Sequence, residues 1–291
     1  MLLNTKKGNI SYWLFLIPSL VAVITVILIP LLYGIYTSFT NSDGFNMDFI
    51  GLENYRQLFS DSQFIESMWF TLKFAVVAVI GVNVIGLGFA VLVTQKIGRV
   101  TTFFRTLLFT PNLIGGLILG FIWQFIFNRA FVGIAEITNI DFFNGWLSDP
   151  STAYWGMVIV FLWQMSGYIM LIYIAFLSKI PTELIEAAQL DGASALQTFT
   201  HIKMPLLAPA FTVSLFLTLA NAFKVYDLNL ALTSGGPFRS SEMVAMNIYN
   251  TAFLQYKQGY AQAKGVVFLV VIVLISIAQV YFTRQREVDL S

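Results

Sequence analysis

Six long apolar runs constrain the fold of this chain more than any other feature of its sequence. A helix that crosses a bilayer needs about 20 mainly apolar residues. Six segments meet that requirement, namely 12–39, 70–93, 106–127, 153–177, 206–226 and 261–282. Residues 266–275 are apolar on every side, whereas the strands of a membrane barrel would alternate. Because lipid offers no hydrogen-bond partner to the backbone, the sequence predicts an all-α membrane protein with six transmembrane helices in one domain, residues 1–291.

The composition excludes several other classes of protein. Hydrophobic residues make up 57% of the chain, charged residues only 11%, and the net charge is +1. Such a charge provides no basic field for nucleic acid. The absence of Cys excludes disulfides, a thiolate nucleophile and Cys-based metal sites. The first apolar run is longer than a signal-peptide core and no small-x-small cleavage site follows it, so we expect a retained anchor helix.

The distribution of basic residues predicts the orientation in the membrane. If both termini are cytoplasmic, the cytoplasmic side carries Lys6, Lys7, Lys96, Arg99, Arg105, Lys179, Lys203, Arg284 and Arg286. The opposite loops then carry only Arg56, Arg129, Arg239 and Lys257. Since short cytoplasmic loops are enriched in Lys and Arg, we predict that both termini are cytoplasmic.

The loop of residues 179–205, between the fourth and fifth runs, has the pattern of two short helices. Glu183 suits the positive end of the first helix, Gly192 permits a turn after it, and Pro205 can begin the next span. The small side chains of Ala187 and Ala188 would let a partner approach the backbone closely. Taken alone, a Glu-Ala-Ala-x-x-Asp-Gly string is more typical of an ordinary capped surface helix than of a docking site.

This loop resembles the EAA motif of binding-protein-dependent ABC importer permeases of the carbohydrate type. Residues 186–188 (Glu-Ala-Ala) are followed by three residues and Gly192, and then by Phe199, Ile202, Pro205 and Pro209. The resemblance implies a type I ABC importer permease fold, in which this loop forms coupling helices that dock into a cleft of a separate ATPase subunit. The coupling residues that it implies are Glu183, Glu186, Ala187, Ala188, Asp191, Gly192, Ala193 and Phe199.

A second resemblance lies beyond the fifth run. Phe223-Lys-Val-Tyr-Asp227 and Leu232-Thr-Ser-Gly-Gly-Pro237 are similar to a segment of sugar permeases of the maltose-transporter large-subunit and glycerol-phosphate type. Tyr226 departs from the family, which often has Phe there. Tyr249-x-x-Ala-Phe253 and Gly259-Tyr-Ala-Gln-Ala263 also resemble this subfamily.

Together the resemblances imply a permease that imports a carbohydrate, with an oligosaccharide favoured, by alternating access across a bacterial plasma (inner) membrane. The alternative is an ABC permease for glycerol phosphate or another non-sugar solute. The implied partners are a second homologous permease, two ATPase subunits that hold ATP and Mg²⁺, and an extracytoplasmic solute-binding protein.

Polar side chains at membrane depth are costly and often mark a solute path. Sugars are recognised by amides and carboxylates together with aromatic faces. The candidates for the path are Gln124, Trp163, Gln164, Asn221, Tyr226 and Asp227. Other roles stay open, since Trp residues can form an interfacial belt and Asp227 can pair with Lys224. Asn83 can serve the path or helix packing, whereas Gln279 favours a helix-to-helix hydrogen bond.

Motifs for chemistry are missing from the sequence. It contains no Gly-x-x-x-x-Gly-Lys-Ser/Thr phosphate loop, no Gly-x-Ser-x-Gly elbow and no His-Glu-x-x-His helix. The single His, His201, has no Cys or second His beside it and favours a surface role. We therefore predict a non-catalytic subunit that itself binds no cofactor or metal. A channel or a membrane enzyme would need a filter segment or a catalytic set.

Overall fold

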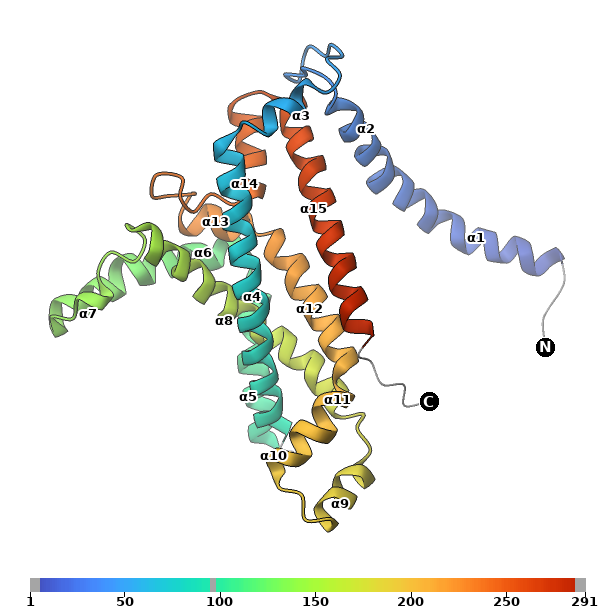
Figure 1. The fold of residues 1–291 in the computed structure, drawn as a ribbon, viewed down its shortest axis with the longest axis vertical. Coiled ribbons are helices and arrows are strands. Elements are labelled where there is room, and N and C mark those ends of the chain that lie inside the picture. The colour runs from blue at the N-terminus through green and yellow to red at the C-terminus, as the bar shows by residue number, and fades with distance from the viewer. Residues whose placement is uncertain (1–5, 95–97, 286–291) are drawn as a thin grey trace. The chain divides into compact units, whose positions relative to one another are not determined.

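A computed structural model describes residues 6–94 and 98–285 of the chain (Figure 1). Helices dominate it, and within these ranges the only β pairing is an isolated bridge between Thr40 and Phe49. The described residues form two compact units. The first unit holds residues up to 62 together with 248–269, and the second holds 63–247 together with residues from 270 onward.

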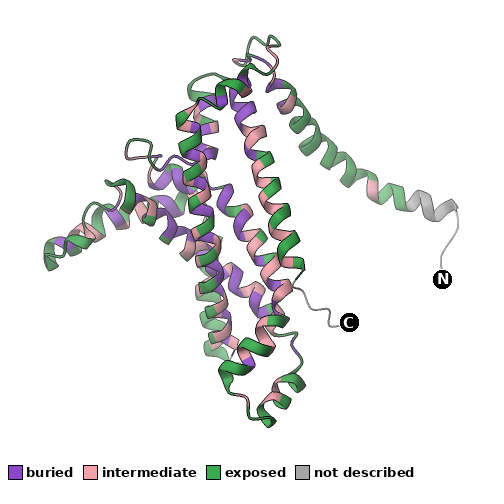
Figure 2. Ribbon diagram, in the orientation of Figure 1, coloured by how far each residue is buried: buried purple, intermediate pink, exposed green. Residues whose placement is uncertain are grey.

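The first unit begins with α1 (Lys6–Val23), a π-helical turn (Ile24–Leu28) and α2 (Ile29–Thr37), and continues to α3 (Glu53–Leu58). The π turn lies just before Pro30, which has no backbone N–H to donate. The unit also contains a π turn (Asn250–Leu254) and the first part of α15 (Gln258–Arg284). No residue in the most apolar window of Tyr12–Thr37 is buried in the structure (Figure 2).

Polar contacts fasten the loop after α2 to the start of α15 in this unit. Gly259 donates its N–H to the carbonyl of Ser42 (2.9 Å), and a Cβ at this glycine would collide with the carbonyl of Thr40. The buried Lys264 forms an ion pair with Asp61 (2.8 Å), which also accepts the hydroxyl of Tyr260 (2.8 Å). The motif of residues 259–263 therefore has a packing role.

The second unit contains most of the remaining helices. They are α4 (Ser62–Thr94), α5 (Arg99–Phe109), α6 (Gly116–Phe125), α7 (Phe131–Thr138), α8 (Pro150–Leu177), α9 (Thr182–Leu190), α10 (Ala195–Thr198), α11 (Met204–Leu206), α12 (Ala208–Phe223) and α13 (Asp227–Leu232). The connecting turns are 3-10 helices at Thr110–Leu113 and Asp141–Phe143 and π helices at Ile126–Ala130 and Phe199–Lys203. The last short helix, α14 (Val244–Tyr249), leads back to the first unit.

A buried hydrogen-bond network joins α4, α8 and α12. The hydroxyl of Tyr173 donates to Oδ1 of Asn83 (2.8 Å) and accepts from Ser214 Oγ (2.9 Å). Asn83 is thus a packing residue, which decides between the two roles that the sequence left open. Gln279 likewise donates to the carbonyl of Thr212 on α12 (3.4 Å), as its expected helix-to-helix role requires.

The helices confirm an all-α membrane fold. Five are long and apolar enough to cross a membrane: Tyr12–Thr37, Ser62–Thr94, Gly116–Thr138, Pro150–Leu177 and Gln258–Arg284. A sixth is present if the bent pair Ala195–Leu206 and Ala208–Phe223 is one span. The cytoplasmic location of the termini stays a prediction, and Lys96 and Arg286, which contribute to it, lie outside the described residues.

Two spans differ from the sequence prediction. The segment 106–127 is not continuous, because α5 ends at Phe109 and α6 begins only at Gly116, and the apolar span there is Gly116–Thr138. Pro111 and the glycines at 115 and 116 explain this break. The segment 206–226 is shorter than expected. Its helix begins at Ala208 after a 68° bend and ends at Phe223.

Candidate functional site

A polar cavity lies where two helical segments of the second unit are interrupted. Its volume is about 410 Å³, within the range of small-molecule pockets. The first interruption separates α5 from α6 and the second separates α12 from α13. The polar side chains that line the cavity are Asn112, Gln164, Asn221, Lys224, Tyr226 and Asp227. Broken helices are a common means by which transporters surround a polar cavity within a membrane.

A side chain of α8 stabilises the first break. Gln164 Nε2 donates to the carbonyl of Ile114 (3.0 Å), which lies in the non-helical segment before α6. A backbone carbonyl in an apolar surrounding needs such a partner. Gln164 therefore has a structural role in addition to its position at the cavity wall.

Close packing of α6 on α13 fixes the position of α13, the helix that follows the second break. A Cβ on Gly120 would lie 2.5 Å from the Cβ of Ala231, and one on Gly116 would lie 3.2 Å from the Cβ of Asp227. The spacing of four residues on both helices brings these positions onto facing surfaces. Since α13 begins at Asp227, this packing holds the carboxylate at the cavity.

Several polar groups of the cavity have unused hydrogen-bonding capacity. Asn221 Nδ2 donates to Leu217 of its own helix (2.8 Å), and within 98–285 its Oδ1 accepts no hydrogen bond. Lys224 and Asp227 are exposed and form no ion pair with each other, contrary to the alternative that the sequence allowed. The described lining thus carries one cation and one carboxylate beside neutral amides.

The structure brings together four of the six residues predicted for the solute path. Gln124 and Trp163 do not line the cavity. Gln124 Nε2 lies 3.5 Å from the carbonyl of Leu232, and Trp163 stacks edge-to-face on Trp123 with ring centroids 5.6 Å apart. Asn112 is a lining residue that the sequence reasoning missed, although its place beside Pro111 in an apolar run was a usable signal.

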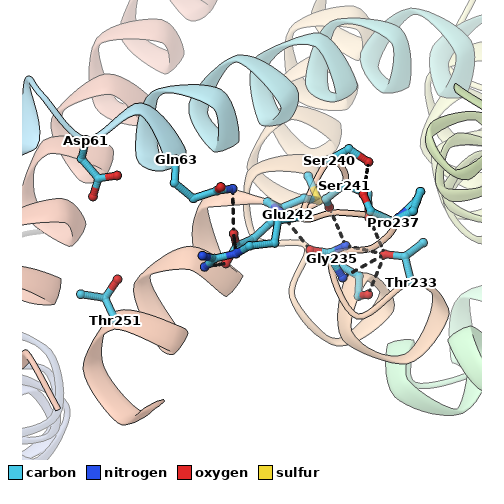
Figure 3. Close-up of polar contacts among 12 residues, drawn as sticks. Asp61, Gln63, Thr233, Gly235, Pro237, Ser240, Ser241, Glu242 and Thr251 are labelled. Carbon is cyan, nitrogen blue, oxygen red and sulfur yellow. Dashed lines mark hydrogen bonds and ion pairs between the residues drawn. The ribbon is translucent and has the colours of Figure 1, made fainter. Parts of the chain in front are cut away.

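The Thr-Ser-Gly-Gly-Pro segment, residues 233–237, uses its polar groups to hold its own loop (Figure 3). Buried Asn229 donates to Thr233 Oγ1 (2.9 Å) and to the carbonyl of Ser241 (2.8 Å), and it accepts the N–H of Met243 (3.0 Å). Ser241 Oγ donates to Thr233 Oγ1 (2.8 Å). Gly235 has a φ of +79°, which favours glycine. This segment, which resembles sugar permeases, does not line the cavity.

A buried carboxylate supports the same loop. Glu242 forms two hydrogen bonds with Arg239, from Nε (3.0 Å) and a terminal nitrogen (3.1 Å), and accepts a third from Gln63 Nε2 (3.0 Å) (Figure 3). Such a bidentate pair combines charge with fixed geometry. The loop is therefore anchored to the start of α4 as well as to α13.

The EAA segment forms a helix with a glycine stop. α9 ends at Leu190, and Gly192 takes a φ of +81°. The N–H of Ala193 donates to the carbonyl of Ala188 (2.9 Å) and that of Gly192 to Gln189 (3.1 Å), the two bonds of a Schellman motif. This geometry explains why the motif requires glycine after Asp191.

The next short helix begins with a capping box. Ser194 Oγ accepts the N–H of Gln197 (3.3 Å), and Gln197 Oε1 accepts the N–H of Ser194 (2.8 Å). The pattern Ser-x-x-Gln is the sequence signature of this box. The two helices expected for this loop are thus confirmed, and each has a defined terminus.

The turn between these helices presents a solvent-exposed surface. No residue of α9 is buried, and Leu190 and Leu196 are 89% and 71% exposed. A hollow of about 360 Å³ lies beside Gly192 and Ala193. Apolar side chains displayed this way are unfavourable in water and suit a protein partner.

A family model for the inner membrane component of binding-protein-dependent transport systems matches residues 83–288. The chain belongs to this family. It is accordingly a multi-pass membrane permease and not an enzyme. The permease is 51% identical over 285 residues to the probable starch degradation products transport system permease AmyD of Thermoanaerobacterium thermosulfurigenes, covering 98% of this chain and 97% of that protein.

Two further proteins resemble the permease along nearly its whole length. It is 30% identical over 295 residues to the sn-glycerol-3-phosphate transport system permease UgpA of Brucella abortus, covering 97% of both chains. Its fold matches a chain in the crystal structure of a bacterial alginate ABC transporter in complex with an alginate pentasaccharide-bound periplasmic protein. The TM-score is 0.82 at 19% identity, over 96% of both chains.

Proposed function

We propose that this permease imports a carbohydrate, with an oligosaccharide favoured, and that the solute passes the cavity between the broken helices. The observation that supports this proposal is the polar cavity. Amides of Asn112, Gln164 and Asn221 suit sugar hydroxyls, and the ring of Tyr226 suits an apolar sugar face. The 51% identical relative is named for starch degradation products, which supports the same solute class.

The 30% identity to a glycerol-phosphate permease supports a second candidate. An anionic solute requires compensating positive charge at membrane depth. The described lining has Lys224 but also Asp227, so its balance of charge favours a neutral sugar.

Substitution of Asn221 tests the role of the cavity. In the complete transporter reconstituted in vesicles, Asn221→Ala should lower uptake of labelled oligosaccharide at limiting concentration about tenfold, because a hydrogen bond to the solute is lost. The control is Asn144→Ala, since Asn144 is exposed and lies outside the cavity. Unchanged uptake by the Asn221 variant would remove this cavity from the path. A panel of oligosaccharides and polyol phosphates would separate the two solute classes.

We further propose that the turn between α9 and α10 docks into a separate ATPase subunit. The coupling surface comprises Glu183, Glu186, Ala187, Ala188, Asp191, Gly192, Ala193 and Phe199. Its support is the exposed, capped geometry of the turn and the family's ATP-driven transport. Closure of the ATPases on ATP and Mg²⁺ would move the turn as a rigid lever and favour one of two membrane conformations.

The glycine stop provides a sharp test of coupling. A Cβ at Gly192 meets open space, so a substitution there acts through backbone strain and leaves packing unchanged. Gly192→Val should reduce the solute imported per ATP hydrolysed, whereas Gly192→Asn should largely retain it, because Asn tolerates the left-handed conformation. Glu186→Lys should also uncouple the two activities. Normal coupling in both Gly192→Val and Glu186→Lys would contradict the docking role.

The assembly that we propose contains a second homologous permease, two ATPase subunits and an extracytoplasmic solute-binding protein, with both termini of this chain cytoplasmic. The most apolar window within Tyr12–Thr37 has no buried residue, which supports a requirement for lipid or a partner helix around it. Crosslinking of single-Cys variants in the turn to the ATPase, with labelling of the termini from either side, would test the contact and the orientation.

A further inference from the structure

An aromatic groove runs between α4 and the beginning of α8, away from the solute cavity. Its volume is about 660 Å³. Trp69 and Phe70 of α4 and Tyr154 and Trp155 of α8 line it, and Lys73 lies among them. Both helices are long and apolar enough to cross the membrane, so lipid molecules surround this face unless a protein partner covers it.

The groove is built on fixed contacts between the two helices. The ring of Phe70 meets that of Tyr154 edge-on with centroids 5.5 Å apart, and Tyr154 meets Trp155 in the same manner at 5.4 Å. The hydroxyl of Tyr154 also donates to the backbone carbonyl of Lys73 (3.3 Å). Trp69 and Trp155 are 61% and 48% exposed, as expected for rings at a membrane–water interface.

Lys73 is the unusual member of this groove. It follows Leu72 and precedes an uninterrupted apolar stretch, and within the described ranges no carboxylate forms an ion pair with its ammonium group. Glu66 lies two turns earlier on α4, and Asp149, before α8, accepts the N–H groups of Ser151 and Thr152. Lys73 is exposed, so in the uncovered groove water can solvate its ammonium group, and a molecule that covers the apolar walls has to supply a counter-ion in place of that water.

We infer that this groove is a binding site for one anionic phospholipid. Its phosphate would accept hydrogen bonds from the Lys73 ammonium, and its glycerol region and upper acyl chain would lie against Trp69 and Trp155. Trp and Tyr side chains favour the headgroup level of a bilayer, where the glycerol region of a phospholipid lies. A basic side chain near the membrane surface attracts anionic lipid. A phospholipid supplies both features that the groove requires, namely an anion and an apolar chain.

A helix of a partner permease is a poorer occupant. An apolar helix would cover the aromatic walls but would leave Lys73 buried without a counter-charge. A soluble phosphate would neutralise Lys73 but would leave the aromatic walls in contact with bulk lipid. The inference rests on the membrane-spanning character of α4 and α8 and is independent of which solute the permease carries.

Native mass spectrometry of the complete transporter tests this site. The purified complex is equilibrated with equal amounts of phosphatidylglycerol and phosphatidylcholine whose acyl chains match, and the retained lipids are counted. The wild-type complex should retain one phosphatidylglycerol that the Lys73→Gln variant retains about fivefold less often, the effect of one basic group near the surface. Lys73→Arg should keep it. The control Lys257→Gln, at an exposed lysine outside the groove, should match the wild type.

A double variant separates the two parts of the site. Trp69→Leu with Trp155→Leu should weaken retention of both lipids, because the apolar walls hold the chain of either. Excess glycerol phosphate should not displace the lipid. Equal retention of the two lipids by wild type and Lys73→Gln would overturn the inference. So would dissociation of the partner permease in the Lys73→Gln variant, because it would identify the groove as a protein interface.

Discussion

The polar cavity and the loop of residues 233–243 are neighbours in the sequence, yet they use polar groups in opposite ways. Thr233 and Ser241 of the loop and Asn229 of α13 bond to one another and to the backbone. In the cavity, Lys224 and Asp227 form no ion pair with each other, and the amide oxygen of Asn221 is free in the described structure. A polar group whose bonds are all made within the chain stabilises the fold, whereas one with unused capacity is available to a solute.

This difference changes how the family resemblance is understood. The Gly-Gly-Pro segment suggested a carbohydrate permease, and it supports that assignment as a mark of the subfamily. Its own side chains do not line the cavity. The loop instead bonds to α13, the helix that begins with Asp227 at the cavity, through the N–H of Met243 and the carbonyl of Ser241.

The largest effect is expected at Asn229, which holds the loop from α13. Asn229→Ala leaves the N–H of Met243 and the carbonyl of Ser241 without their buried partner, which should lower the free energy of unfolding by about 3 kcal/mol. A thermal unfolding curve of the purified transporter would measure this loss. Asn144→Ala, at an exposed asparagine, serves as the control and should be neutral. If the Asn229 variant were as stable as wild type, the loop would not have the structural role assigned to it.

A smaller effect is expected where α6 packs on α13, the helix that joins the cavity to the loop of residues 233–243. Gly120→Val places a side chain on the Cβ of Ala231 and should destabilise the permease by about 2 kcal/mol while it displaces Asp227 from the cavity. Unfolding and uptake should therefore change together. Gly133→Ala is the matched control, because a Cβ there meets nothing within 4 Å. Loss of uptake at unchanged stability would indicate that Gly120 contacts the solute path itself.

The sequence predicted the helical membrane fold and the two short helices within residues 179–205 because long apolar runs and helix-terminus residues such as Gly192 are local signals. The break before α6 was missed. There, Pro111 and the glycines at 115 and 116 interrupt a run whose hydrophobicity continues, and the donor that stabilises the break, Gln164, comes from another helix. Of the six residues predicted for the path from polarity, four line the cavity and Gln124 and Trp163 do not, because polarity does not reveal which side of a helix faces a cavity. The role of all six in a solute path stays a prediction.

The smallest effects, and the most informative about the solute, concern the two cavity charges. If a neutral sugar passes, Lys224→Gln and Asp227→Asn should each reduce uptake only a fewfold. Each variant weakens a hydrogen bond to the sugar, and neither charge attracts or repels an uncharged solute. If a phosphorylated solute passes, Lys224→Gln should reduce uptake much more, and Asp227→Asn should increase it by removing a like charge. Initial uptake rates of both variants at limiting solute distinguish these outcomes. Because neither charge forms an ion pair within 98–285, their substitution should leave unfolding unchanged, in contrast to the self-bonded loop beside them.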